Sequence, residues 1–162
     1  MLILLASNNK HMLLRWEQGL FGLFPTAVVH SFQPLTERLG KLRPDILLLD
    51  YALPGLKNQQ SISELINLAI ETKIVIFSSG FSDDIEWRLL KIGVKGCCLS
   101  DLNAAQIKRV IDVISQGELW FRRSLTNRIL SELVKVTFEK NRIEQAVRDL
   151  LENLTRREYE IA

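Results

Sequence analysis

Short apolar runs separated by amphipathic patterns occupy most of the chain. The runs have the length of strands and end at small or polar residues: Leu2–Ala6, Ala27–His30, Ile46–Leu49, Lys73–Phe77 and Gly96–Leu99. None of them alternates strictly between apolar and polar residues. This pattern indicates strands that are covered on both faces, as in a parallel sheet.

Between these runs, apolar residues recur at helical spacing. They form five faces: Met12, Leu13, Trp16 and Leu20; Leu35, Leu39 and Leu42; Ile62, Leu65, Ile66 and Ala69; Ile85, Leu89 and Ile92; and Ile107, Val110, Ile111 and Ile114. Arg43-Pro44, Gly93 and Gly117 supply stop signals for three of the helices. The repeated alternation predicts an α/β fold, a flavodoxin-like (βα)5 doubly wound parallel sheet of order 2-1-3-4-5.

The pattern changes from about Arg122, after which no strand signal follows. Apolar residues recur at steps of four and three and form a heptad seam: Ile129, Leu133, Val136, Ile143, Val147, Leu150 and Leu154. The seam predicts a long C-terminal helix that dimerises as a coiled coil. The alternative is an amphipathic helix packed back on its own domain. Lys140 occupies the one interior seam position that should be apolar, where it would weaken a dimer core or fix its register.

The composition is that of a globular protein, but it does not indicate a particular function. The 162 residues suit one domain and an appendage, and 47% hydrophobic and 25% charged residues are globular values. A net charge of +2 is too small to imply a nucleic-acid partner. The adjacent Cys97 and Cys98 predict reduced thiols in a cytoplasmic protein, and no apolar segment is long enough to cross a membrane.

Asp50 is the most informative polar residue. It ends the apolar run Ile46–Leu49 and enters the turn Leu53-Pro54-Gly55, which places a carboxylate at the carboxyl end of a buried strand. Open α/β sheets bind ligands at this end, where the strand order reverses between strands one and three. We therefore expect the Ser7–Asn9 loop to lie beside Asp50.

Several stretches in order resemble the receiver domain of bacterial response regulators of the NarL/FixJ class. They are Arg43–Asp50, Leu53–Gly55, Lys73–Ser78, Ile92–Gly96 and Gln116–Phe121, within residues 1–121. The last residues, Leu154–Ala162, resemble the opening of a LuxR-type helix-turn-helix, with Thr155 and Glu158 as a capping box; an ordinary helix start is the alternative. The resemblance divides the chain into a receiver-like domain (1–121), a linker or dimerisation helix (122–153) and an incomplete helix-turn-helix (154–162).

The resemblance implies that Asp50 accepts a phosphoryl group, with Mg²⁺ held by an acidic pair after strand one. It also implies a hydroxyl after strand four, a lysine after strand five and a switch aromatic within strand five. The corresponding positions here are Ser7 and Asn8 for the acidic pair, Ser78 for the hydroxyl, Ser100 for the lysine and Cys97 for the aromatic. Only Ser78 keeps the family's residue type. A single carboxylate leaves Mg²⁺ little reason to shed water, so at most weak Mg²⁺ binding is expected at Asp50.

Two alternatives concern the site itself. Lys95 could replace the missing ammonium, but it precedes the fifth strand and would lie at the wrong end of the sheet. Asp50 could simply accept hydrogen bonds from Ser78, Ser7 or Asn8 as part of a polar network that needs no phosphate.

These features favour an atypical, phosphorylation-independent response regulator that controls transcription. Its receiver would act as a homodimerising and docking module for a DNA-binding domain that lies outside this chain. One alternative is a conventional phospho-aspartate switch at Asp50, in a two-component phosphorelay with a sensor kinase. Another is a small-molecule sensor whose pocket is lined by Ser7, Asn8, Asn9, Ser78, Ser79 and Ser100. We expect no enzymatic activity, no resident cofactor and no membrane contact.

Overall fold

The computed structural model describes the backbone of residues 1–161 and the side chains of residues 1–152. The chain divides into two compact units, Met1–Arg122 and the segment that begins at Arg123. Each unit is described by itself below.

The first unit contains a parallel sheet of five strands in the order β2-β1-β3-β4-β5. The strands are β1 (Ile3–Ala6), β2 (Thr26–Val29), β3 (Ile46–Asp50), β4 (Lys73–Ser78) and β5 (Gly96–Leu99). Every residue of β1 and β3 is buried, as the absence of apolar–polar alternation indicated. The predicted fold class and strand order are confirmed.

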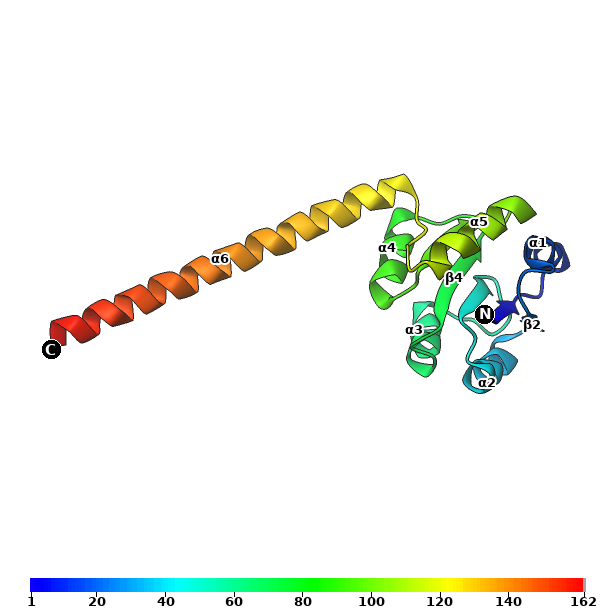
Figure 1. The fold of residues 1–162 in the computed structure, drawn as a ribbon, viewed down its shortest axis with the longest axis horizontal. Helices are drawn as coiled ribbons and strands as arrows, with labels where there is room; N and C mark the ends of the chain where they lie inside the picture. Colours follow the sequence, from blue (N-terminus) through cyan, green and yellow to red (C-terminus); the bar gives the residue numbers. More distant parts are fainter. Residues whose placement is uncertain (162) are drawn as a thin grey trace. The chain divides into compact units, whose positions relative to one another are not determined.

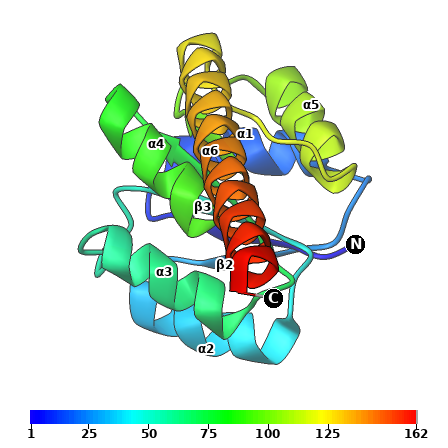
Figure 2. The same cartoon turned by 90° about the vertical axis from the view of Figure 1, so that its left-hand side faces the viewer.

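Helices cover both faces of this sheet (Figures 1 and 2). They are α1 (Lys10–Leu20), α2 (Phe32–Leu42), α3 (Gln59–Leu68), α4 (Asp83–Ile92) and α5 (Ala104–Ser115). One core forms between the sheet and α1 with α5, around Trp16, Phe77 and Ile111. A second core forms on the opposite face with α2, α3 and α4. The loops that lead from the carboxyl ends of β1, β3, β4 and β5 into the following helices carry the residues of the site.

The expected helix stops agree with the backbone, with one difference in the apolar faces. Arg43 and Gly93 end α2 and α4 in the left-handed conformation, with φ of 44° and 114°. Leu42, predicted to face inward, is 38% exposed because it lies in the last turn of α2, beyond the buried Leu39.

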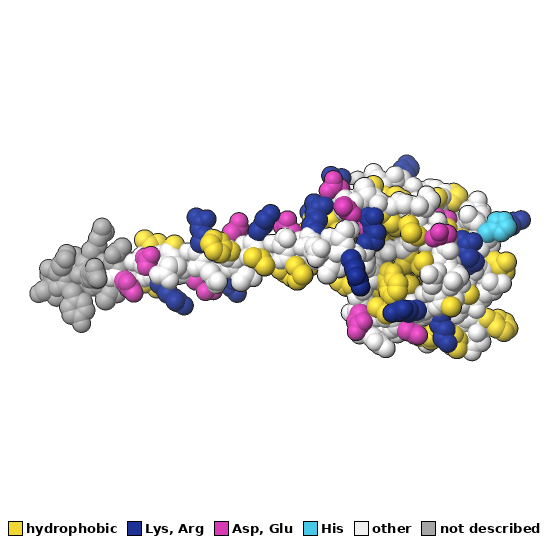
Figure 3. Space-filling view, turned by 90° about the horizontal axis from the view of Figure 1, so that it is seen from above, with side chains coloured by type: hydrophobic (Ala, Val, Ile, Leu, Met, Phe, Trp, Pro, Cys, Tyr) yellow, Lys and Arg dark blue, Asp and Glu magenta, His cyan; other side chains and the backbone are white. Residues whose placement is uncertain are grey.

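The second unit consists of α6 (Arg123–Ile161). Of the predicted seam, Ile129 is partly exposed and the side chain of Leu154 lies outside the described residues. Five seam residues are between 49% and 65% exposed: Leu133, Val136, Ile143, Val147 and Leu150. Figure 3 shows apolar side chains interspersed with charged ones on this helix. The coiled coil stays a prediction, and the capping box at Thr155 and Glu158 falls on side chains outside the described residues.

No helix in the described part of the chain has both the length and the apolar character to cross a membrane.

Candidate functional site

Asp50 ends β3 at the carboxyl edge of the sheet, and its side chain is only 5% exposed. Its Oδ2 accepts a hydrogen bond from the Ser7 hydroxyl at 2.7 Å, and its Oδ1 accepts one from the Ala52 N–H at 2.9 Å. Of the donors considered from sequence, Ser7 is therefore the one in contact. Both carboxylate oxygens are therefore hydrogen-bonded within the chain.

Ser7, which falls on the first acidic position of the family, is fully buried. Its Oγ also accepts the N–H of Asn9 at 3.0 Å, so it relays a backbone donor to Asp50. Asn9 in turn caps α1, because its Oδ1 accepts the N–H groups of His11 and Met12. In the loop after β1, the side chains of Ser7 and Asn9 therefore form hydrogen bonds within the chain, and the positions of the family's acidic pair carry no carboxylate.

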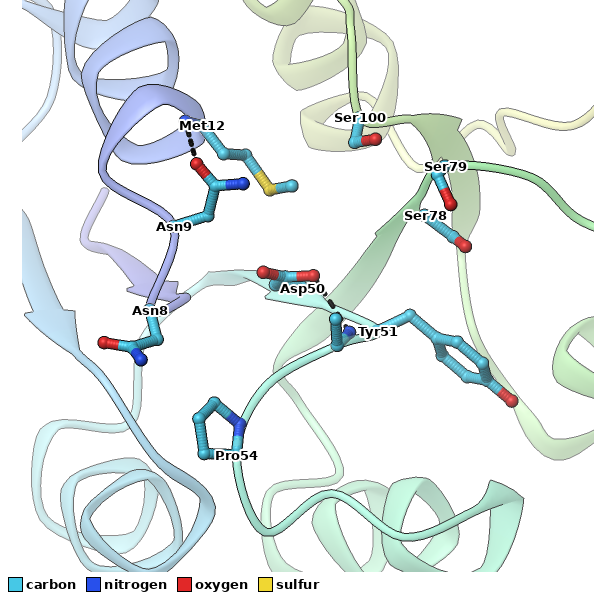
Figure 4. Close-up of a pocket in the computed structure, with 10 residues that line it drawn as sticks. Asn8, Asn9, Met12, Asp50, Tyr51, Pro54, Ser78, Ser79 and Ser100 are labelled. Atoms are coloured by element: carbon cyan, nitrogen blue, oxygen red, sulfur yellow. Dashed lines mark hydrogen bonds between the residues drawn. The ribbon is translucent and has the colours of Figure 1, made fainter.

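A cavity of about 630 Å³ opens beside Asp50 (Figure 4). Its described lining consists of Asn8, Asn9, Met12, Asp50, Tyr51, Ala52, Pro54, Ser78, Ser79 and Ser100. Sequence reasoning anticipated Asn8, Asn9 and the three serines. It missed Met12 and the turn residues after Asp50, and it placed Ser7 in the lining, whereas Ser7 lies buried behind the carboxylate. Asp50 is the one charged side chain among these ten lining residues.

Ser78 keeps the residue type that the family uses, but its hydroxyl is engaged elsewhere. Its Oγ donates to the Gly80 carbonyl at 3.0 Å and accepts the Gly80 N–H at 3.3 Å. The hydroxyl therefore stabilises the loop between β4 and α4. In this geometry it is not offered to a group bound at Asp50.

Ser100, at the family's lysine position, brings no charge of its own. Its backbone carbonyl accepts a hydrogen bond from Nη2 of Arg15, which reaches across from α1. Sequence reasoning missed Arg15, because nothing in the local pattern joins residues 85 positions apart. Arg15 does not belong to the described lining of the cavity.

Cys97 and Cys98 lie in β5 and point to opposite faces, Cys97 into the α2–α4 core and Cys98 into the α1–α5 core. Burial disfavours the thiolate and raises the pKa of both groups, with a smaller contribution from the charge of Glu86. The pKa of Cys98 rises to about 12. Cys97 is therefore a fixed core residue, where the family has an aromatic ring that can move.

An ion pair between the buried Glu86 of α4 and the half-exposed Arg122, at the end of the first unit, was also not predicted from the sequence. Glu86 is completely buried, and its Oε2 accepts Nε–H of Arg122 at 2.6 Å. Nη2 of Arg122 further donates to the Phe81 carbonyl and to Asp83, at 3.0 and 3.1 Å. Arg122 therefore fixes the start of α4 and the loop before it.

The residues at Asp50 do not fit the Mg²⁺ ion that the resemblance implies. Mg²⁺ requires oxygen ligands in near-octahedral geometry and sheds its water reluctantly. Asp50 is the one carboxylate in the described lining of the cavity, and the polar side chains beside it are neutral asparagines and serines. Among the described residues, no cluster of three acidic, histidine or cysteine side chains could hold a metal ion.

Comparison with known proteins agrees with this fold. No family model matches the chain. It is 24% identical over 132 residues to the transcriptional regulatory protein DegU of Brevibacillus brevis, an alignment covering 77% of this chain and 56% of DegU. It is 26% identical over 119 residues to the nitrate/nitrite response regulator NarL of Escherichia coli K12, covering 71% and 55%.

Among solved structures, a LuxR-family two-component response regulator from Aurantimonas superposes with a TM-score of 0.66 and 18% identity. The match covers 82% of this chain and 97% of that one. The chain is therefore similar in sequence to transcriptional response regulators, and in fold to a two-component response regulator of the LuxR family. It spans about half the length of the curated relatives it matches, and the described lining of the cavity at Asp50 lacks most of the charged residues that the resemblance implies.

Proposed function

We propose that this chain is the receiver part of an atypical transcriptional response regulator whose action does not depend on phosphorylation of Asp50. Its fold serves as a docking module, and α6 joins two copies. A DNA-binding output lies in a domain that the described chain does not contain. The similarity to transcriptional regulators such as DegU supports the output class.

The observation that carries this proposal is the set of side chains around Asp50. A phosphoryl group on Asp50 would add negative charge in a cavity whose described lining contains no lysine, arginine or second carboxylate. Such chemistry needs opposite charge to stabilise the transferring group. The remaining hydroxyl, on Ser78, is already hydrogen-bonded to Gly80.

Intact mass spectrometry after incubation with acetyl phosphate and Mg²⁺ tests this proposal. We expect the mass of the chain to stay unchanged under conditions that label a conventional receiver run in parallel. The matched variant is Asp50→Asn, which removes the charge and keeps the shape of the side chain. A gain of one phosphoryl group that is lost in Asp50→Asn would favour the conventional phospho-switch instead.

A second candidate function, a small-molecule sensor, is favoured by the cavity itself. Its volume of about 630 Å³ lies within the usual range of ligand pockets, and it sits at the switch point of the sheet. Its lining combines a carboxylate, five neutral polar side chains from asparagine and serine, and the apolar groups of Met12, Tyr51 and Pro54.

Thermal-shift screening with a library of uncharged and cationic metabolites tests the sensor function, because a ligand that binds the folded state raises the melting temperature. The shift should disappear in Asp50→Asn and persist in Asp101→Asn, whose exposed carboxylate does not line the cavity. A shift that survives Asp50→Asn would place the ligand elsewhere.

A further inference from the structure

The apolar seam of α6 needs a partner. Five of its residues expose about half or more of their surface, from 49% at Val147 to 65% at Ile143. Contiguous exposed apolar surface of this kind is rare in monomers and marks an interaction site. A helix in water also gains most of its stability from packing such a face.

One charged residue interrupts this seam, and two opposite charges flank it. In the heptad frame set by Leu133 and Val136, Lys140 falls at an a position, Glu139 at the preceding g position and Glu144 at the following e position. All three side chains are exposed. In the described helix none of them forms an ion pair within α6, whereas Lys135 does so with Glu132 at 3.9 Å.

The position of Lys140 discriminates between the arrangements of two helices. In an antiparallel pair, or in a register shifted by one heptad, each Lys140 would face an apolar seam residue such as Ile143 or Val147. Two separate layers would then each bury an ammonium group against hydrocarbon, which is costly. In a parallel pair in register, both lysines share one layer and only that layer is polar.

The flanking glutamates place opposite charge beside the paired lysines in this arrangement. In a parallel pair, the g and e positions of the two chains lie along the edges of the seam. Glu139 and Glu144 of both copies then surround the two Lys140 side chains. The long lysine stems can extend along the apolar surface so that each ammonium reaches a carboxylate of the other copy.

We propose that the occupant of the α6 seam is a second copy of this chain, packed parallel and in register. Lys140 forms with Glu139 and Glu144 of both copies a charged layer that selects this arrangement. The inference rests on the dimerising role proposed above and adds the orientation, the register and the residues that set them.

Disulfide trapping of two single-cysteine additions, Leu133→Cys and Leu150→Cys, tests the orientation in the whole chain. The native Cys97 and Cys98 are buried and leave the introduced thiols as the reactive ones. We expect each variant by itself to form a disulfide-linked dimer under mild oxidation. Only a parallel pair in register brings both positions next to their own copies.

Sedimentation of the reduced variants separates the two proposals. A monomer would overturn both the dimerising role and the charged layer. A dimer in which the single variants do not link, while a mixture of the two links 133 to 150, would overturn the parallel arrangement alone.

Lys140→Leu in the same cysteine backgrounds tests the charged layer. Removing the charge should tighten the dimer and, at the same time, allow 133-to-150 links that are absent when Lys140 is present. Arg142→Leu is the matched control, because position 142 lies outside the seam and should leave the linkage pattern unchanged. If Lys140→Leu also leaves the pattern unchanged, Lys140 does not set the orientation.

Discussion

At the scale of single residues, Asp50 keeps its position in the fold while the groups around it have changed. The hydroxyl of Ser7 and the N–H of Ala52 solvate its carboxylate. Because both donors belong to the same chain, the Asp50 carboxylate stabilises the edge of the sheet as well as forming part of the candidate site.

Ser7→Ala should lower the free energy of unfolding by about 1–3 kcal/mol, because it deprives a buried carboxylate of a donor. Urea denaturation measures this change. The control is Ser131→Ala, an exposed position on α6, which should stay within about 0.5 kcal/mol of the parent. Equal stability of Ser7→Ala and the parent would show that the hydrogen bond contributes nothing.

The thiol of Cys98 gives a pH-dependent prediction. Its folded pKa of about 12 exceeds the ordinary value of 9.0, so the folded state disfavours the thiolate. Its contribution to stability is complete below pH 9 and is lost as the pH rises from there toward 12, where the unfolded chain ionises first. The unfolding free energy of the parent should therefore fall more steeply above pH 9 than that of Cys98→Ala, by up to about 1.4 kcal/mol per pH unit. Parallel slopes for the two proteins would contradict the buried thiol.

Sequence reasoning placed Asp50 at the sheet edge because an apolar run and a Pro-Gly turn are local signals. The orientation of the Ser78 hydroxyl could not be predicted from the sequence, because a serine at this position can face either the cavity or its own loop. Only the geometry of the Gly80 turn decides between the two.

At the scale of elements, α4 is held at its start by a charged side chain from a distant segment. Glu86 is completely buried, and Arg122 provides its hydrogen-bonding counterion. Two residues 36 positions apart carry no periodic signal, so sequence reasoning could not pair them.

Arg122→Ala should destabilise the first unit by about 2–3 kcal/mol, because it leaves the Glu86 carboxylate buried without a counterion. This value lies below the usual range of about 3–5 kcal/mol for a broken buried pair, because the Arg122 side chain is 45% exposed. Chemical denaturation gives the value. Arg123→Ala, at the neighbouring exposed arginine, should change stability little. Comparable effects of both substitutions would argue against the ion pair.

Helices α1 and α5 pack closely because Gly19 lacks a side chain. A Cβ at Gly19 would lie 2.7 Å from the Ala104 carbonyl oxygen, at the start of α5. Gly19→Ala should therefore destabilise the protein by about 1–3 kcal/mol, although alanine normally favours a helix.

Gly40→Ala is the matched control, because Gly40 lies in α2 and a Cβ there meets nothing within 4 Å. This change should raise the melting temperature, with a gain of about 0.5–1 kcal/mol. Stabilisation by both substitutions would contradict the close approach of α1 to α5.

The hydrophobic pattern predicted these elements well because each strand is a short apolar run and each helix has one inward face. The five strands lie within one residue of the predicted bounds at either end. The close contact at Gly19 was not predictable, since a glycine inside a helical pattern gives no information about its neighbour.

At the scale of the whole molecule, we propose that two chains dimerise through α6 without phosphorylation of Asp50. Five described seam residues of α6 are exposed and apolar, and the described lining of the cavity at Asp50 contains no lysine, arginine or second carboxylate. The pairing of two chains should then be constitutive.

Sedimentation equilibrium of the parent chain and of Asp50→Asn, each with and without beryllofluoride and Mg²⁺, tests this claim most directly. We predict a dimer with the same dissociation constant in all four samples. A parent chain that is monomeric alone and dimerises only with beryllofluoride and Mg²⁺, while Asp50→Asn stays monomeric, would contradict it.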